Sequence, residues 1–122
     1  MSGISPIGAT RENSSLSLFG TDGGNEPVRE WLKGLKREDR KTIGEDIKTV
    51  QFGWPLGMPL IRKVEPGVWE VRSSISQGIA RVLFTVEGHT MMLLHGFIKK
   101  SQKTPRTELR TAHQRLADLR KE

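Results

Sequence analysis

The chain is predicted to be an α+β domain with an N-terminal helical hairpin, a four-stranded antiparallel sheet and a C-terminal helix. Three observations predict this class. Apolar residues recur at helical spacing in residues 27–51, and again in residues 104–120. Between them, residues 60–97 are rich in β-branched and aromatic residues interrupted by turn signals. The length of 122 residues suits one small domain.

The two helices of the hairpin have separate signals. The first begins at Pro27, a favourable first helical position, and its apolar residues are Val28, Trp31, Leu32 and Leu35. The second runs from about Glu38 to Gln51, with a buried stripe of Ile43, Ile47 and Val50. Residues 52–59 hold two Gly and two Pro and must form a loop; Trp54 there is expected to pack under the sheet, or to stack on a base.

The two ends of the chain differ in character. Residues 1–26 are dominated by Ser, Gly, Thr and Asn, so we expect a disordered extension preceding a domain of residues 27–122. The alternative is that Leu16, Leu18 and Phe19 dock as a short strand or on a partner. The final helix is expected to start with Thr104 as its cap and Pro105 in its first turn. Arg115 and Arg120 are expected on its solvated side.

The expected strands and turns place two arginines together. The strands are Leu60–Glu65, Val68–Ser76, Ile79–Val86 and His89–Phe97, joined by turns at Pro66–Gly67, Gln77–Gly78 and Glu87–Gly88. A two-residue loop at Gln77–Gly78 sets Ser74 opposite Arg81, with Arg72 as the diagonal neighbour on the same face, roughly 7–8 Å away. Two guanidinium groups so placed suit a phosphate. The alternative is a solvated face on which Glu70 neutralises Arg72.

A cluster of cations follows the last strand. It consists of Lys99, Lys100 and Lys103, with Arg106 beside it. Residues 99–122 carry eight Lys or Arg and three Asp or Glu, which is +5 of the total net charge of +6. This distribution favours a polyanion or another acidic partner.

The chain lacks the residues that several classes of function require. There is no cysteine for a disulfide, a thiolate nucleophile or a metal site. The Gly-rich stretch 20–24 lacks the Lys-Ser/Thr ending of a nucleotide-binding loop, and the three histidines lack metal-ligand spacing. We therefore expect no metal and no small-molecule cofactor. Without a secretory signal or an apolar run near 18 residues, we expect no membrane span and a cytoplasmic location.

The remaining chemistry suits RNA cleavage by attack of a 2′-hydroxyl on the neighbouring phosphate. Arg72 and Arg81 would hold the phosphate, with help from the lysine cluster of residues 99–103, one member of which is a candidate base. Glu70 is a second candidate base. His95 is a candidate acid or base, although a plain turn at Glu87–Gly88 would place it on the core side as a hydrogen-bonded histidine. A bulge in this hairpin would reverse that orientation.

The stretches VWEVRSSISQGIARVLFTV and MMLLHGFIKKSQKTP resemble the phage-derived branch of the RelE/HigB toxins of bacterial toxin–antitoxin pairs. The resemblance covers about Pro27 to Glu122 and implies a RelE-like fold. It implies a small cytoplasmic toxin that cuts mRNA in the ribosomal A site. The implied partner is a cognate antitoxin, often a helix-turn-helix (HigA-like) protein. The family's basic site positions correspond here to Arg72, Arg81, Lys99 and Lys100.

Together with these residues, the resemblance implies a metal-independent, ribosome-dependent mRNA endonuclease that inhibits translation and arrests growth. Two alternatives remain: a non-enzymatic toxin like the ParE branch, or a nucleic-acid-binding module. Several relatives use a tyrosine or histidine near the C-terminus, whereas this chain has no tyrosine and its last histidine, His113, lies within the final helix. The general acid is thus not assigned by the resemblance.

Overall fold

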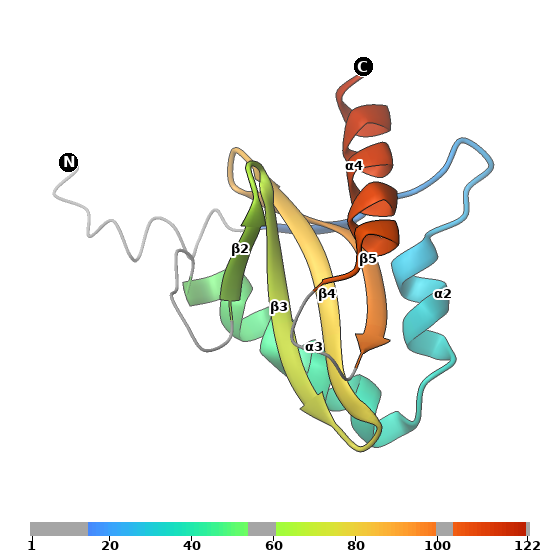
Figure 1. The fold of residues 1–122 in the computed structure, drawn as a ribbon, viewed down its shortest axis with the longest axis vertical. Coiled ribbons are helices and arrows are strands. Elements are labelled where there is room, and N and C mark those ends of the chain that lie inside the picture. The colour runs from blue at the N-terminus through green and yellow to red at the C-terminus, as the bar shows by residue number, and fades with distance from the viewer. Residues whose placement is uncertain (1–14, 54–60, 100–103, 122) are drawn as a thin grey trace, which may run out of the picture.

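The computed structural model describes residues 15–53, 61–99 and 104–121. The predicted α+β class is confirmed, and each predicted helix and strand is present. In chain order the elements are β1 (Ser15–Leu18), α2 (Pro27–Lys33), α3 (Arg37–Gly53), β2 (Ile61–Glu65), β3 (Val68–Ile75), β4 (Gly78–Glu87), β5 (Thr90–Lys99) and α4 (Arg106–Arg120) (Figure 1).

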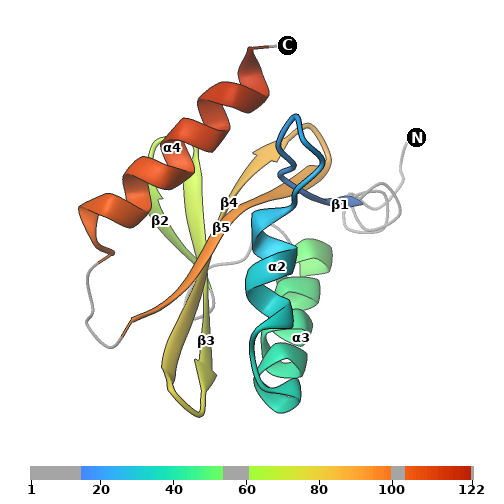
Figure 2. The ribbon, with the colours of Figure 1, turned by 90° about the vertical axis from the view of Figure 1, so that its right-hand side faces the viewer.

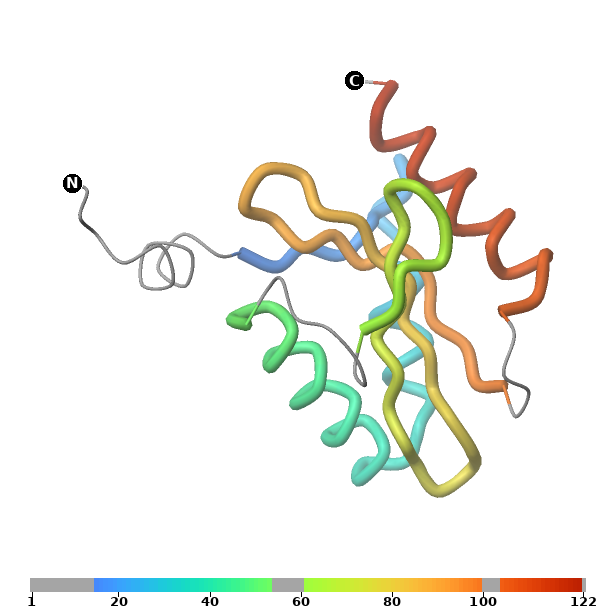
Figure 3. The backbone as a smooth tube through the Cα atoms, turned by 60° about the vertical axis from the view of Figure 1, so that its left-hand side comes forward, coloured from blue at the N-terminus to red at the C-terminus, as the bar shows by residue number. Residues whose placement is uncertain are grey.

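The sheet has five strands in the order β1-β5-β4-β3-β2, which corrects the predicted four-stranded antiparallel sheet. Strands β2 to β5 form an antiparallel meander, and β1 adds to the edge of β5 in the parallel direction. Figure 3 shows β1 beside β5 although the two are far apart in sequence. This is the docked strand considered above as the alternative to disorder; the domain boundary at residue 26 stays a prediction.

Helices cover both faces of the sheet (Figure 2). Helices α2 and α3 lie on one face, where α2 packs on β5 and α3 packs on β3, and α4 crosses the other face. The predicted helical hairpin is corrected, because α2 and α3 pack on different strands of the sheet rather than chiefly on each other. The core on the α2–α3 side includes Val28, Ile43, Ile47, Val50, Val71, Val82 and Phe84. The core on the α4 side includes Phe19, Val68, Leu83, Leu94, Phe97, Ala112 and Leu116.

The middle of β5 has a glycine because α2 lies directly against its backbone. A Cβ atom on Gly96 would fall 2.3 Å from Cε3 of Trp31, far inside van der Waals contact. The indole ring of Trp31 therefore occupies the space that a side chain at position 96 would need. Trp31 is a packing residue of α2, as predicted from its helical spacing.

The β3–β4 hairpin has a different register from the predicted one. Ile75 pairs with Gly78, so the two-residue loop is Ser76–Gln77 and Arg72 lies directly opposite Arg81. The carboxylate of Asp39 in the first turn of α3 explains the difference. It accepts hydrogen bonds from the backbone N–H of Ser76 (3.2 Å) and from its hydroxyl (2.8 Å). A contact from another element thus holds this turn in place.

The β4–β5 hairpin turns at Gly88–His89 rather than at Glu87–Gly88. Gly88 has φ +62°, the left-handed conformation that a glycine at the first turn position adopts easily. Four pairs further along, the register shifts by one residue, so that Phe84 pairs with Leu93 but Leu83 pairs with His95. Leu94 is the extra residue of this β-bulge.

The expected loop of residues 52–59 begins later than predicted, because Phe52 and Gly53 still belong to α3. The packing expected for Trp54 lies outside the described residues. Among the helices of the described segments, none has both the length and the apolar character that crossing a bilayer requires.

Candidate functional site

Arg72 and Arg81 lie on the face of the sheet that carries α4, as direct partners across β3 and β4. Their exposure differs sharply: the Arg72 side chain is 20% exposed, whereas that of Arg81 is completely buried. The predicted pairing of two arginines on one face is confirmed. Only Arg72, however, presents surface to a ligand in this structure.

Glu70 is the counter-charge for both arginines. It is fully buried; its Oε1 lies 3.8 Å from Nε of Arg72, and its Oε2 lies 3.9 Å from Nη1 of Arg81. The hydroxyl of Thr104 donates to Oε2 at 2.7 Å. Thr104 was predicted to cap α4, and this is wrong, because the residue before the helix is Pro105 and no side chain caps it.

The electrostatics of this cluster follow from burial and from neighbouring charges. Burial lowers the pKa of Arg81, the carboxylate of Glu70 raises it, and the nearby Arg72 and Arg62 lower it further. Arg62 pairs with Glu70 across β2 and β3, so it shares their face, and its side chain is exposed. Two guanidinium groups lie against one buried carboxylate, and Arg62 adds a third positive charge on the same face, so this part of the sheet carries an excess of positive charge.

The predicted lysine cluster is described in part. Lys99, the last residue of β5, is exposed and pairs with Ile79 of β4, next to the pair that Arg81 forms with Phe97. This register puts Lys99 on the same face as Arg81, at diagonal-neighbour separation of roughly 7–8 Å between backbones. Lys100 and Lys103 lie outside the described residues. Arg106 is exposed at the first position of α4.

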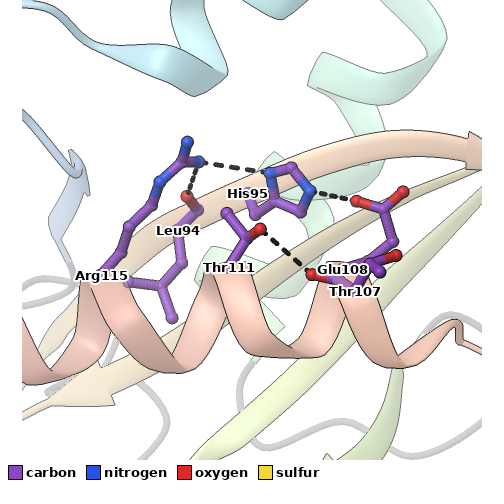
Figure 4. A network of polar contacts seen from close by, with 6 residues as sticks. All are labelled: Leu94, His95, Thr107, Glu108, Thr111 and Arg115. Atoms are coloured by element: carbon purple, nitrogen blue, oxygen red, sulfur yellow. Dashed lines mark hydrogen bonds and ion pairs between the residues drawn. The ribbon is translucent and has the colours of Figure 1, made fainter.

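His95 also faces α4, because the bulge at Leu94 turns it away from the α2–α3 core. Its Nε2 lies 2.5 Å from Oε1 of Glu108, and its Nδ1 lies 3.2 Å from Nη1 of Arg115 (Figure 4). Its ring stacks on that of Phe97, with centroids 5.6 Å apart. Since arginine can only donate, Nδ1 is assigned as the acceptor and Nε2–H as the donor to Glu108. The core-side orientation expected from a plain turn is corrected.

Arg115 was predicted on the solvated side of its helix, and this is wrong. The guanidinium reaches under α4 to the sheet, where Nη1 donates to the carbonyl oxygen of Leu94 at 2.8 Å as well as to His95. Burial lowers the pKa of Arg115. Neither Arg115 nor Glu108 could be singled out from the sequence, because their roles depend on the bulge and on the crossing of α4 over β5.

The other histidines lie away from this group. His113 pairs with Glu65 of β2, and His89 is exposed in the β4–β5 turn. Arg120 pairs with Glu87 at 3.1 Å, with both side chains about half exposed. Within the described segments, no group of three or more His, Asp or Glu side chains is arranged to hold a metal ion.

The arrangement combines two chemical capacities on one face. Arg72 and Lys99 offer exposed positive charge to an anion, with the buried pair of Arg81 and Glu70 beneath them. His95 and Glu108, both partly exposed, form a hydrogen-bonded pair between an imidazole and a carboxylate. Such a pair can pass a proton to or from a ligand bound beside it.

A protein-family model matches most of the chain. The family model described as "Phage derived protein Gp49-like (DUF891)" matches residues 30–117, which include β2 to β5 and most of α4. No curated protein matches the chain.

Proposed function

Because the chain belongs to the phage-derived Gp49-like family, which is related to the toxins of toxin–antitoxin pairs, we propose that it is such a toxin and cleaves mRNA on the ribosome. One observation supports the cleavage step most directly. Opposed arginines, an exposed lysine and a histidine–carboxylate pair share one face of the sheet.

The proposed phosphate contacts are the exposed cations. Arg72 and Lys99 bind the scissile phosphate, and Lys100, Lys103 and Arg106 bind the flanking RNA backbone. Arg81 has no exposed surface; it pairs with Glu70 in the interior, and the carboxylate of Glu70 in turn holds Arg72 in place. Glu70 is therefore assigned to positioning, because its two oxygens face the two guanidinium groups and the hydroxyl of Thr104.

The proposed proton transfers involve His95 and Glu108. The ribose 2′-oxygen attacks the adjacent phosphorus and loses its proton to this pair. The bond from phosphorus to the 5′-oxygen breaks, and that oxygen takes up a proton. The products are a 2′,3′-cyclic phosphate and a 5′-hydroxyl. The stacking on Phe97 and the two hydrogen bonds of the imidazole fix the ring where this exchange needs it.

The proposed protein partner is an antitoxin. A toxin of this kind is tolerated by its host only while a partner covers or blocks it. An acidic segment that meets Arg62, Arg72 and Lys99 would satisfy the excess positive charge of the site directly. Bulk that prevents entry into the ribosome would serve the same purpose.

The test is primer extension on translated messages after induction of the full chain in bacteria. We expect in-frame cuts within translated regions and growth arrest. Arg72→Ala should reduce cutting roughly 10- to 100-fold, the value of one charge-assisted contact. His95→Gln should reduce it by about 100-fold or more. Arg37→Ala is the matched control, because Arg37 is exposed on α3, which covers the opposite face of the sheet.

Two outcomes would contradict the proposal. Intact messages together with stalled DNA gyrase would support a non-enzymatic toxin. The full burial of Arg81 favours this second function, because a buried guanidinium cannot contact a phosphate. Cutting that persists in both Arg72→Ala and His95→Gln at equal expression would place the active site elsewhere.

A further inference from the structure

We propose that Phe19, in the segment before the region matched by the family, is a positioning residue for His95 and acts through Arg115. The inference rests on the proposed function, in which His95 transfers protons. Phe19 lies outside residues 30–117, the region that the family model matches.

Phe19 is anchored where β1 ends. Its backbone N–H donates to the carbonyl oxygen of Leu93 at 2.9 Å, and its side chain is only 7% exposed in the core beneath α4. Strand β1 pairs with β5 as far as Leu93, one residue before the bulge at Leu94. The carbonyl oxygen of Leu94 therefore lies beyond the paired part of β1, and the guanidinium of Arg115 bonds to it instead.

The aromatic ring of Phe19 supports this guanidinium. Cζ of Arg115 lies 5.9 Å from the centre of the Phe19 ring, within the range of a cation–π contact. Without the ring, Arg115 has space to move. A groove of about 950 Å³ borders both residues, and its other lining residues include the apolar Leu18 and Met92 and the acidic Asp22 and Asp118. The ring of Phe19 thus selects the inward position of Arg115 over an outward one.

The position of Arg115 determines the hydrogen-bonding state of His95. An arginine N–H at Nδ1 requires that nitrogen to accept, so the ring proton must be on Nε2, facing Glu108. If Arg115 moves away, Nδ1 loses its donor and the other tautomer is no longer excluded. The segment around Phe19 therefore controls which nitrogen of His95 carries the proton that Glu108 accepts.

The test uses the ¹⁵N-labelled full chain and long-range ¹H–¹⁵N spectra of its three histidine rings, assigned by substitution. We expect the Nε2–H tautomer for His95 in the wild type. Phe19→Leu keeps an apolar side chain in the core but removes the ring, and we expect mixed tautomers. Phe19→Tyr keeps the ring and should restore the wild-type signals. Leu16→Ala is the matched control, because Leu16 is an exposed residue of β1, the strand that precedes Phe19.

The same variants are assayed for RNA cleavage. Phe19→Leu should lower kcat roughly tenfold with little change in KM, because proton transfer is impaired and phosphate binding is not. Unchanged His95 nitrogen signals in folded Phe19→Leu and in Arg115→Leu would refute the inference, whatever the activity. If His95→Gln cleaves at the wild-type rate, the proposed function fails, while the spectra still decide whether Phe19 positions His95.

Discussion

Replacing Glu70 by glutamine tests how the two arginines are held. The substitution keeps the shape of the side chain and an oxygen that can accept from Thr104, but it removes the charge. Carboxylate oxygens lie 3.8 Å from Arg72 and 3.9 Å from Arg81 in the wild type. At an effective dielectric constant of about 20, each separation corresponds to a gross attraction of roughly 4 kcal/mol.

The loss in Glu70→Gln should be dominated by Arg81, since its guanidinium is fully buried whereas that of Arg72 is partly exposed to water. Removing one partner of a buried ion pair costs about 3–5 kcal/mol. We expect the free energy of unfolding to fall by this amount. The double variant Glu70→Leu, Arg81→Met removes both buried charges and should recover most of the loss.

Urea unfolding, followed by tryptophan fluorescence, measures these differences. Glu87→Gln is the control, because it breaks the exposed pair with Arg120 and should change stability by less than about 1 kcal/mol. If Glu70→Gln unfolds within about 1 kcal/mol of the wild type, the carboxylate does not offset the buried guanidinium. Its assignment to positioning would then be wrong, and its candidacy as a base would return.

Substitutions of Gly96, Asp39 and Lys99 each test one local interaction. Gly96→Ala should lower the free energy of unfolding by about 3 kcal/mol in the same urea assay, because the new Cβ would overlap Trp31; a neutral result would mean that α2 moves freely. Asp39→Ala should cost about 1–2 kcal/mol by removing two hydrogen bonds to Ser76, and hydrogen exchange should show the loss at the β3–β4 turn first. Lys99→Ala should leave stability unchanged but reduce the salt dependence of single-stranded RNA binding, measured by anisotropy, by a slope of about 0.7. An unchanged slope would remove Lys99 from the RNA contacts.

The strands and the α3 helix could be predicted from the sequence because their signals are local. The turn at Pro66–Gly67 and the start of α2 at Pro27 each depend on one or two residues, and both lie in the structure where they were predicted. The β3–β4 register moved by two residues because Asp39 of a distant helix holds Ser76. A shift by two keeps every side chain on its face, so the shared face of the two arginines was predicted correctly in spite of it.

The site around His95 was less accessible to sequence reasoning. The bulge at Leu94 shifts the register by one, which reverses the face of every residue after it, and no glycine or proline marks it. Arg115 lies among other arginines on α4 and has no distinguishing pattern. The docking of Phe19 depends on the free edge of β5, which becomes visible only once the sheet is assembled.

The close approach of Trp31 to Gly96 gives the protein an internal optical probe. The backbone of β5 lies between the indole of Trp31 on one face of the sheet and the imidazole of His95 on the other. A molecule that displaces this imidazole will disturb the strand and change the emission of the indole. With the other two tryptophans, Trp54 and Trp69, replaced by phenylalanine, occupancy could be followed in real time without any attached dye.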